Sequence, residues 1–325
     1  MIELDANLVC RKMNVAGKRR VPYLFGVDFE MENGFFIEHP MENHSLLFTI
    51  GNQSNHTTLP VAGQAPARLT KTPGSYQDYL RKFGLVSTAL HKGNSFLLNL
   101  TERTPIECNL SLEDIYSRSH ARYKILMPGK FVCFSPESFV QITSGEISSY
   151  PMKGTIDASL PNAAEQLMAD YKETCEHNTI VDLIRNDLSI VAEQVRVRRF
   201  RYVDVLKTNQ KELLQTSSEI CGKLSGNYHE RLGNIIFDML PAGSISGAPK
   251  QSTVNTIREA EKMNRGYYTG VFGYYDGETL DSAVMIRYIE QEGGKYYFRS
   301  GGGITVNSKP EEEYQEVLDK IYLPL

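Results

Sequence analysis

Short runs of alternating apolar and polar residues, separated by turn residues, occupy much of this 325-residue chain. In residues 1–70 the alternation, for example in 23–29 and 32–36, predicts hairpins, with Asn33-Gly34 as the sharpest turn. Further strands are expected at 95–101, through much of 122–155, and at 267–276, 281–291 and 295–299.

Helical spacing is confined to a few segments. It predicts helices over 76–91, over 163–187, from Pro249 to Arg265, and from Pro310 onward, with Pro249 in a first turn and Gly266 as a stop. Strands and helices do not alternate regularly, which favours an α+β fold over a doubly wound parallel sheet. With no repeat and no low-complexity linker, we expect one domain over 1–325, with a strand-rich part at 1–70 and a catalytic region at 75–323.

The composition excludes several classes of function. The net charge of −4 and the lack of a long basic run argue against nucleic-acid binding. The five cysteines are scattered and form no C-x-x-C pair, so neither disulfides nor zinc are indicated. No apolar run could span a membrane and no signal pattern is present, so we expect a cytoplasmic protein that acts on small molecules.

Two glycine-containing segments resemble phosphate-binding loops only superficially. Gly243–Lys250 lacks the G-K-[ST] ending of a nucleotide loop, and Gly301–Gly303 does not form G-x-G-x-x-G. A nucleophile elbow of the G-x-[SC]-x-G type is also absent. This chain is therefore not expected to hydrolyse glutamine itself.

Four segments together resemble the chorismate-utilising enzyme family. They are Pro151–Thr155, Glu176–Asp187, Pro241–Lys250, and Gly301–Ile304 followed by Glu313–Glu316. Their order and separation match over roughly residues 75–323. The resemblance implies an α+β fold of two orthogonally packed antiparallel β-sheets flanked by helices, in four layers.

Lys153 is the most informative residue of these segments. An isolated lysine is most often a solvated surface charge, but Lys153 lies in Pro-Met-Lys-Gly-Thr. In the family that these segments resemble, aminodeoxychorismate synthases carry lysine at this position, whereas anthranilate synthases and the isochorismate or salicylate enzymes usually carry alanine. The resemblance implies that Lys153 adds to ring C2 of chorismate as the C4 hydroxyl leaves, and that ammonia then adds at C4. Such a lysine must be neutral, so its pKa must be lowered.

Glu137 matches the family's general acid, which protonates the departing hydroxyl. It lies 16 residues before Lys153, a separation that predicts neighbouring hairpin strands. The alternative interpretation is an exposed turn carboxylate.

Three glutamates are the candidate ligands of Mg²⁺. The resemblance implies that Glu176 and Glu316 bind the ion, which would hold the ring carboxylate of chorismate, and hard carboxylate oxygens suit Mg²⁺. Glu313 shares a helical face with Glu316, but near a helix start it could equally favour the dipole. Glu173 is a weaker candidate.

The second carboxylate of chorismate needs cationic and amide donors. Arg287 and Tyr268 match the family's carboxylate-binding residues, and Gly301, Gly302 and Gly303 would let backbone N–H groups approach the anion. Ser244 and Lys250 either line the pocket or build the turn. Asp182, Arg185, Asn186 and Asp187 are interpreted as a structural network at a helix end. Gln215 stands where many members carry histidine.

The activity that the resemblance implies is amination of chorismate to 4-amino-4-deoxychorismate, for p-aminobenzoate and folate synthesis. Ammonia would come from a separate glutamine amidotransferase subunit in a heterodimer. Two alternatives remain: formation of anthranilate, or a catalytically silent partner of the glutaminase. Retention of Glu137, Lys153, Glu176 and Glu316 argues against a silent subunit.

Overall fold

The computed structural model describes residues 3–56, 66–207 and 212–325. Within these ranges the strands form two antiparallel sheets of ten and nine strands, here sheet A and sheet B. Sheet A contains β1 (Glu3–Asp5), β2 (Tyr23–Val27), β3 (Asn33–Glu38), β10 (Ser138–Thr143), β11 (Glu146–Ser149), β12 (Met152–Asp157), β13 (Glu193–Lys207), β14 (Glu212–Lys223), β16 (Val271–Tyr275) and β17 (Leu280–Val284).

Sheet B contains β4 (Leu47–Ile50), β5 (Gln53–Ser54), β6 (Leu69–Lys71), β7 (Leu97–Cys108), β8 (Tyr123–Met127), β9 (Phe131–Ser135), β15 (Gly247–Ala248), β18 (Tyr288–Glu292) and β19 (Lys295–Ile304). The helices are α1 (Ala6–Lys18), α2 (Tyr76–His91), α3 (Leu112–Arg118), α4 (Ala163–Ala169), α5 (Tyr171–Val191), α6 (Leu232–Asp238), α7 (Gly243–Ser246), α8 (Lys250–Glu261) and α9 (Pro310–Asp319), with a 3₁₀ turn at Tyr228–Arg231. None of these helices is both long and apolar enough to cross a membrane.

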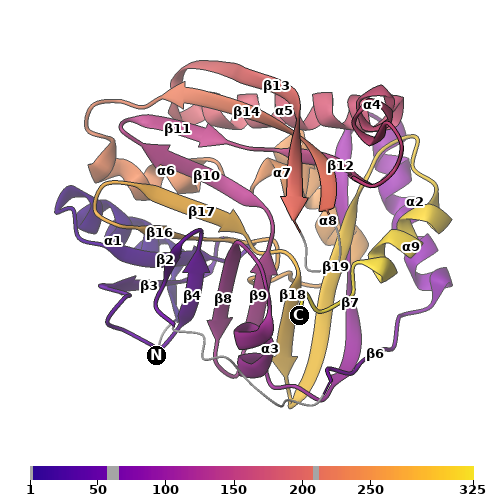
Figure 1. Cartoon of the computed structure of the whole chain (residues 1–325), viewed down its shortest axis with the longest axis horizontal. Coiled ribbons are helices and arrows are strands. Elements are labelled where there is room, and N and C mark those ends of the chain that lie inside the picture. Colours follow the sequence, from indigo (N-terminus) through magenta and orange to yellow (C-terminus); the bar gives the residue numbers. More distant parts are fainter. Residues whose placement is uncertain (1–2, 57–65, 208–211) are drawn as a thin grey trace.

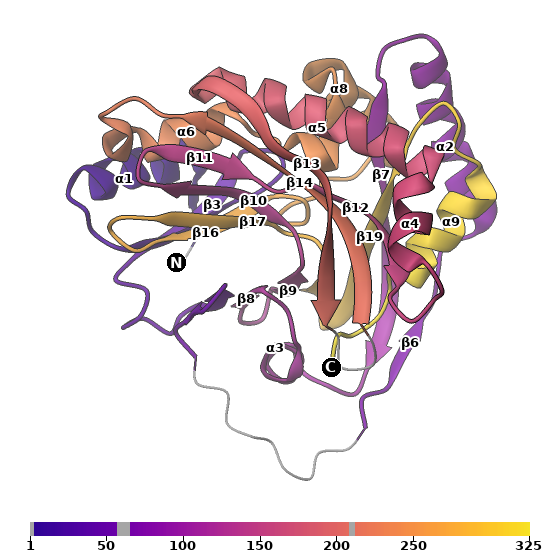
Figure 2. The same ribbon diagram turned by 45° about the horizontal axis from the view of Figure 1, so that its top comes forward.

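The two sheets pack face to face with their strands crossing at a steep angle (Figure 1). Helices α1, α5 and α6 cover the outer face of sheet A, whereas α8 packs against β7 and β15 of sheet B, and α3 lies against the outer face of sheet B (Figure 2). Apolar side chains fill all three interfaces: Val9 and Ile236 under the helices, Phe35 and Phe272 between the sheets, and Ile115 beneath α3. The expected four-layer α+β fold is confirmed.

The N-terminal part is rich in strands as predicted, but it also contains α1, which the sequence interpretation missed. Asp5 caps this helix by accepting the N–H of Leu8. The turn predicted at Asn33-Gly34 is wrong, because both residues lie in β3. The chain reverses just before them, where the Asp28 carboxylate accepts the N–H groups of Glu32 and Asn33. Gly34 is required by packing instead, since a Cβ there would lie 2.5 Å from the carbonyl oxygen of Gly26.

Helices 76–91 and that beginning at Pro310 are confirmed as α2 and α9. The single helix predicted over 163–187 is two helices, because Asp170 leaves the helical conformation and caps α5 by accepting the N–H of Glu173. The helix predicted from Pro249 to Arg265 is shorter. Pro249 is its N-cap, and Lys262 ends it in the left-handed conformation.

The strand predicted over 281–291 is two strands in different sheets. β17 belongs to sheet A and β18 to sheet B, and the chain crosses between the sheets at Ile286 and Arg287. The strand predicted at 267–276 is confined to β16, whereas those at 95–101 and 295–299 extend further, as β7 and β19. Lys153 lies on β12, which pairs with β14 and not with the strands that follow Glu137. The predicted neighbouring-strand relation between Glu137 and Lys153 is therefore wrong.

Candidate active site

Lys153 lies where the ladder between β12 and β14 is irregular. The register shifts between Lys153 and Thr155, and the intervening Gly154 has φ of +71°, a conformation that favours glycine. A Cβ on Gly154 would lie 3.0 Å from Leu167 Cδ1 on α4. The Thr216 hydroxyl donates to the carbonyl oxygen of Lys153. The bulge and this bond fix the direction of the Lys153 side chain.

The Lys153 ammonium faces α5. Its Nζ lies 2.9 Å from Oε2 of Glu176, and the two side chains are 28% and 18% exposed. Burial lowers the pKa of Lys153, but the Glu176 carboxylate, with smaller contributions from Glu173 and Glu316, outweighs it and raises the pKa above its usual value. The lowered pKa expected of a nucleophilic lysine is thus not found while Glu176 is its counter-ion.

Glu137 lies between β9 and β10. The Ser244 hydroxyl, on α7, donates to Oε1 of Glu137 over 2.6 Å. Burial raises the pKa of Glu137, although Ser244, Lys153 and Lys320 act in the opposite direction. A raised pKa keeps a larger fraction of the carboxyl protonated near neutral pH, which is the state that a general acid requires.

The α9 carboxylates lie against the glycine segment of β19. A Cβ on Gly302 would lie 3.3 Å from Oε2 of Glu313 and 3.6 Å from Oε1 of Glu316, so the missing side chain makes room for both. Lys320, one turn after Glu316, pairs with it at 2.6 Å and donates to the carbonyl oxygen of Gly301 over 2.7 Å. The sequence interpretation missed Lys320, although its spacing of four residues from Glu316 was an available signal.

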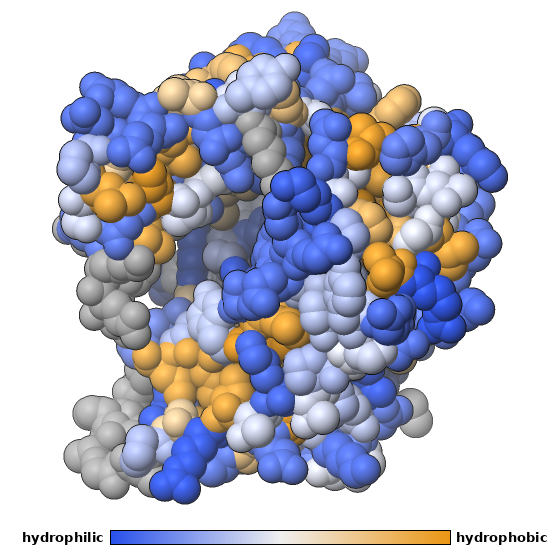
Figure 3. Space-filling model, turned by 90° about the vertical axis from the view of Figure 1, so that its right-hand side faces the viewer, coloured by the Kyte–Doolittle hydropathy of each residue, from blue (hydrophilic) through white to orange (hydrophobic). Residues whose placement is uncertain are grey.

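Arg287 has φ of +54°, in the left-handed region, at the point where the chain changes sheets. Its Nη1 donates to the Lys320 carbonyl oxygen over 3.3 Å, and its guanidinium lies 5.0 Å from the ring centre of Tyr322. An open cleft of about 630 Å³ is lined by Arg287, Glu311, Glu312, Gln315, Glu316, Asp319, Lys320 and Tyr322. Figure 3 shows a hollow with a hydrophilic interior on the face of the molecule that carries α9.

A second, much smaller cavity of about 20 Å³ lies beside Glu137. Ser244, Pro151 and Asp187 are among its lining residues. Lys153 lines neither cavity, but its charge acts on Glu137 and it is acted on by Glu316. The structure therefore brings Glu137, Lys153, Glu176 and Glu316 into one charged group.

Other predicted substrate-binding residues lie apart from this group. Tyr268 is 3% exposed and belongs to the core between the sheets. Lys250 pairs with Asp187 at 2.9 Å and donates to the Met239 carbonyl oxygen, contacts that build the loop. Substrate binding by Tyr268 and Lys250 stays a prediction. Gln215 lies on β14, with its Nε2 3.5 Å from the Thr155 hydroxyl.

The network predicted at a helix end, formed by Asp182, Arg185, Asn186 and Asp187, lies inside α5 instead, because this helix continues to Val191. Asp187 accepts the N–H of Gly243 over 3.1 Å and thereby holds α7 against α5. Arg185 and Asp182 form an exposed pair one turn apart, 3.0 Å between Nη1 and Oδ1. Asp187 is thus the member of this network that supports the site.

Glu176 and Glu316 are the carboxylates that are expected to bind Mg²⁺. Among residues 3–56, 66–207 and 212–325, no three His, Cys, Asp or Glu side chains gather closely enough to hold a metal ion. Glu176 and Glu316 each have a lysine as counter-ion instead. Both carboxylates raise the pKa of Lys153, however, so both lie near enough to act on the same ammonium group. Their donor chemistry fits a hard divalent cation.

Comparison of the sequence with known proteins identifies the family to which this chain belongs. The model of the chorismate binding enzyme family matches residues 36–325, and the chain belongs to that family. It is therefore a chorismate-utilising enzyme.

The individual relatives carry several descriptions. The "Uncharacterized PabA-like protein" of Haemophilus influenzae is 51% identical over 315 residues, covering 96% of this chain and 95% of that protein. Aminodeoxychorismate synthase component 1 of Salmonella typhimurium is 30% identical over 277 residues, which cover 79% of this chain and 60% of that protein. Anthranilate synthase component 1 of Arthrobacter globiformis is 32% identical over 269 residues, 76% of this chain and 49% of that protein. The chain thus matches about half to three fifths of the two synthases.

Solved structures support the fold. The menaquinone-specific isochorismate synthase MenF of Escherichia coli superposes with a TM-score of 0.72 at 17% identity, covering 97% of this chain and 80% of that one. At this identity the likeness concerns the fold alone.

Proposed function

We propose that this protein is an aminodeoxychorismate synthase component I, which converts chorismate and ammonia to 4-amino-4-deoxychorismate and water. The observation that carries the proposal is Lys153, an amine whose Nζ lies 2.9 Å from the candidate metal ligand Glu176. The bulge at Gly154 directs this amine, and the raised pKa of Glu137 supplies an acid within the same charged group. An amine and an acid are the two groups that the proposed reaction needs.

The proposed reaction has two substitutions. In the first, neutral Lys153 adds to ring C2, both ring double bonds shift by one position, and the C4 hydroxyl leaves as water with a proton from Glu137. In the second, ammonia adds at C4, both double bonds shift back, Lys153 leaves as the neutral amine, and the proton lost by the ammonia-derived nitrogen returns to Glu137. The covalent intermediate holds the ring while the leaving hydroxyl is exchanged for an amine.

The two carboxylates of chorismate need separate partners. Glu176 and Glu316 would hold Mg²⁺, with Glu313 as a further candidate, and Arg287, Lys320 and the N–H groups of Gly301–Gly303 would bind the other carboxylate. When bound, the ion would supply positive charge for the substrate's ring carboxylate, and Glu176, as one of its ligands, would no longer serve as the counter-ion of Lys153. Without Glu176 as its counter-ion, buried Lys153 would lose the interaction that raises its pKa most strongly.

Ammonia would come from a separate glutamine amidotransferase subunit, because the sequence lacks a nucleophile elbow of the kind that hydrolyses glutamine. The expected behaviour is turnover with ammonium salts by this chain alone, and turnover with glutamine only after a glutaminase subunit is added.

The test is incubation of the purified chain with chorismate, ammonium and Mg²⁺, with products identified by mass. We expect 4-amino-4-deoxychorismate, whereas anthranilate with release of pyruvate would favour the alternative synthase, and no turnover even with glutaminase and Mg²⁺ would favour a silent partner. Lys153→Ala should abolish formation of the product. Lys309→Ala, which removes an exposed lysine paired with Glu312, is the matched control. Wild-type activity in Lys153→Ala would refute the covalent role.

A further inference from the structure

A buried ion pair connects two parts of the candidate site: the acid half, which contains Ser244 and Glu137, and the glycine half, which contains Gly301–Gly303. Arg265, just after α8, pairs with Glu261 at 2.6 Å, and their side chains are 1% and 5% exposed. Arg265 Nε and Nη2 both donate to this carboxylate, in the two-bond geometry that fits guanidinium to carboxylate. Such a pair is weak evidence for stability, since apolar residues of similar volume are often as stable. Its bonds to the surrounding backbone indicate another role.

One side of the guanidinium reaches the acid half of the site. Arg265 Nη1 donates to the Ile245 carbonyl oxygen over 3.1 Å. Ile245 follows Ser244, whose hydroxyl donates to Glu137. Two bonds therefore fix the short α7: Arg265 donates to the carbonyl oxygen of Ile245, and Asp187 accepts the N–H of Gly243, the first residue of the helix.

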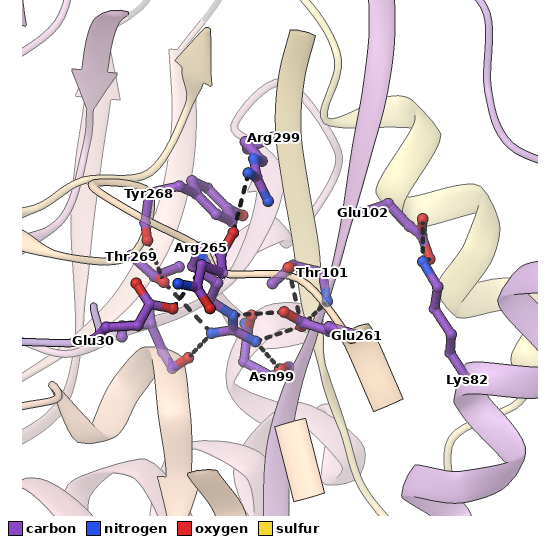
Figure 4. Close-up of polar contacts among 12 residues, drawn as sticks. Glu30, Lys82, Asn99, Thr101, Glu102, Glu261, Arg265, Tyr268, Thr269 and Arg299 are labelled. Atoms are coloured by element: carbon purple, nitrogen blue, oxygen red, sulfur yellow. Dashed lines mark hydrogen bonds and ion pairs between the residues drawn. The ribbon is translucent and has the colours of Figure 1, made fainter. Parts of the chain in front are cut away.

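The other side of the pair reaches the glycine half. Arg265 Nη2 donates to the Asn99 carbonyl oxygen over 2.6 Å, and Glu261 accepts both the N–H and the hydroxyl of Thr101, at 2.9 and 3.0 Å. Asn99 and Thr101 lie on β7, opposite Gly303 and Gly301 of β19. Figure 4 shows these bonds converging on Arg265 and Glu261.

We infer that Arg265 and Glu261 act as a positioning pair that fixes the position of Ser244 and Glu137 relative to the glycine segment Gly301–Gly303. Neither residue need touch the substrate, and the inference rests on the proposed function only in taking Glu137 as the acid. The planar fork of an arginine suits this task, because Arg265 makes two bonds to the carboxylate and one to each of two backbone carbonyls, whereas a lysine has only three N–H donors on a single nitrogen. Small displacements of reacting groups cost large factors in rate.

The test replaces both charges, so that neither remains buried and unpaired. The variant is Arg265→Met/Glu261→Met, and the matched control is Lys82→Met/Glu102→Met. Lys82 and Glu102 pair at 2.8 Å between α2 and the same strand β7, with side chains 20% and 16% exposed. Their side chains bond to each other and lie apart from Arg265 and Glu261 in Figure 4. Thermal unfolding verifies that each variant is folded.

Chorismate consumption with ammonium is then measured across pH. We expect kcat/KM of the Arg265/Glu261 variant to fall at least tenfold, with less than a twofold loss in the control. The alkaline limb of the pH profile of kcat/KM should move to higher pH, as it should in the variant Ser244→Ala, which lacks the hydroxyl that bonds to Glu137. The reason is that loss of the Arg265 bond frees α7 and so weakens the bond from Ser244 to Glu137. In a Ser244→Ala background the double replacement should move this limb no further. Wild-type kcat/KM and an unmoved limb, or an equal loss in the control, would overturn the inference.

Hydrogen exchange gives a readout that does not depend on the reaction. Residues 243–248 and 298–304 should exchange faster in the Arg265/Glu261 variant than in the control. If the wild type consumes no chorismate, the proposed function fails, and exchange still decides the inference: equal rates in both variants would overturn it. If the double variant does not fold, Arg265→Lys replaces it, with the same expected changes in exchange and activity.

Discussion

Ser244→Ala tests the acid in the proposed reaction. The variant removes the hydroxyl that donates to Oε1 of Glu137 over 2.6 Å. A hydrogen bond contributes about 1.5–3 kcal/mol when one partner is charged and about 0.5–1.5 kcal/mol when both are neutral. Ser244 therefore favours the ionised carboxylate by about 1–1.5 kcal/mol. Because 1.36 kcal/mol is about tenfold, its loss should reduce the ratio of ionised to protonated Glu137 about tenfold at a given pH.

The direction of the pH effect follows from the role of the carboxyl. An acid is active when protonated, so kcat/KM falls as pH rises through the pKa of Glu137 in the free enzyme. Burial already raises that pKa, and the Ser244 bond lowers it. Loss of the bond should raise the pKa further and move the alkaline limb to higher pH.

The assay is kcat/KM for chorismate, with saturating ammonium and Mg²⁺, measured in small pH steps. Ser246→Ala is the control, because this buried hydroxyl on the same helix donates to the Ala242 carbonyl oxygen and does not contact Glu137. Its limb should match that of the wild type. An unmoved limb in Ser244→Ala, or one at lower pH, would refute the assignment of Glu137 as the acid that Ser244 tunes.

Three further outcomes are expected. Gly154→Ala should lower the free energy of unfolding by about 1–2 kcal/mol, because φ is +71° there, and should reduce chorismate turnover; unchanged denaturant midpoints would contradict this. Burial lowers the pKa of His229, which bonds to Tyr275, so its contribution to stability is present above the unfolded pKa of about 6.5 and is lost as pH falls below it. His229→Gln should therefore lose less stability than the wild type between neutral and mildly acidic pH in urea titrations, and an equal loss would exclude the effect. Glu316→Gln should raise the Mg²⁺ concentration needed for half-maximal turnover about tenfold or more, whereas an unchanged requirement would exclude Glu316 as a ligand.

Local sequence determined much of the secondary structure. Apolar spacing placed α2 at Tyr76–His91, and Pro310 marked the start of α9. These elements depend on residues only a few positions apart. Two predictions failed because a nearby carboxylate accepted a hydrogen bond from the backbone. Asp170 accepts the N–H of Glu173 and separates two helices that were predicted as one, and Asp28 accepts the N–H of Glu32 in a turn that comes before the one predicted at Asn33-Gly34.

The sequence by itself also determined the chemistry available, because four motifs in order identify a chorismate-utilising enzyme, and Lys153 and Glu137 are the amine and the carboxyl group on which the proposed reaction depends. Only the tertiary structure decided how these groups meet. Ser244 bonds to Glu137 across 107 positions of sequence, and Glu176 becomes the counter-ion of Lys153 and reverses the expected direction of its pKa shift. Such contacts depend on strand register and on packing between separate elements, and no local spacing specifies either.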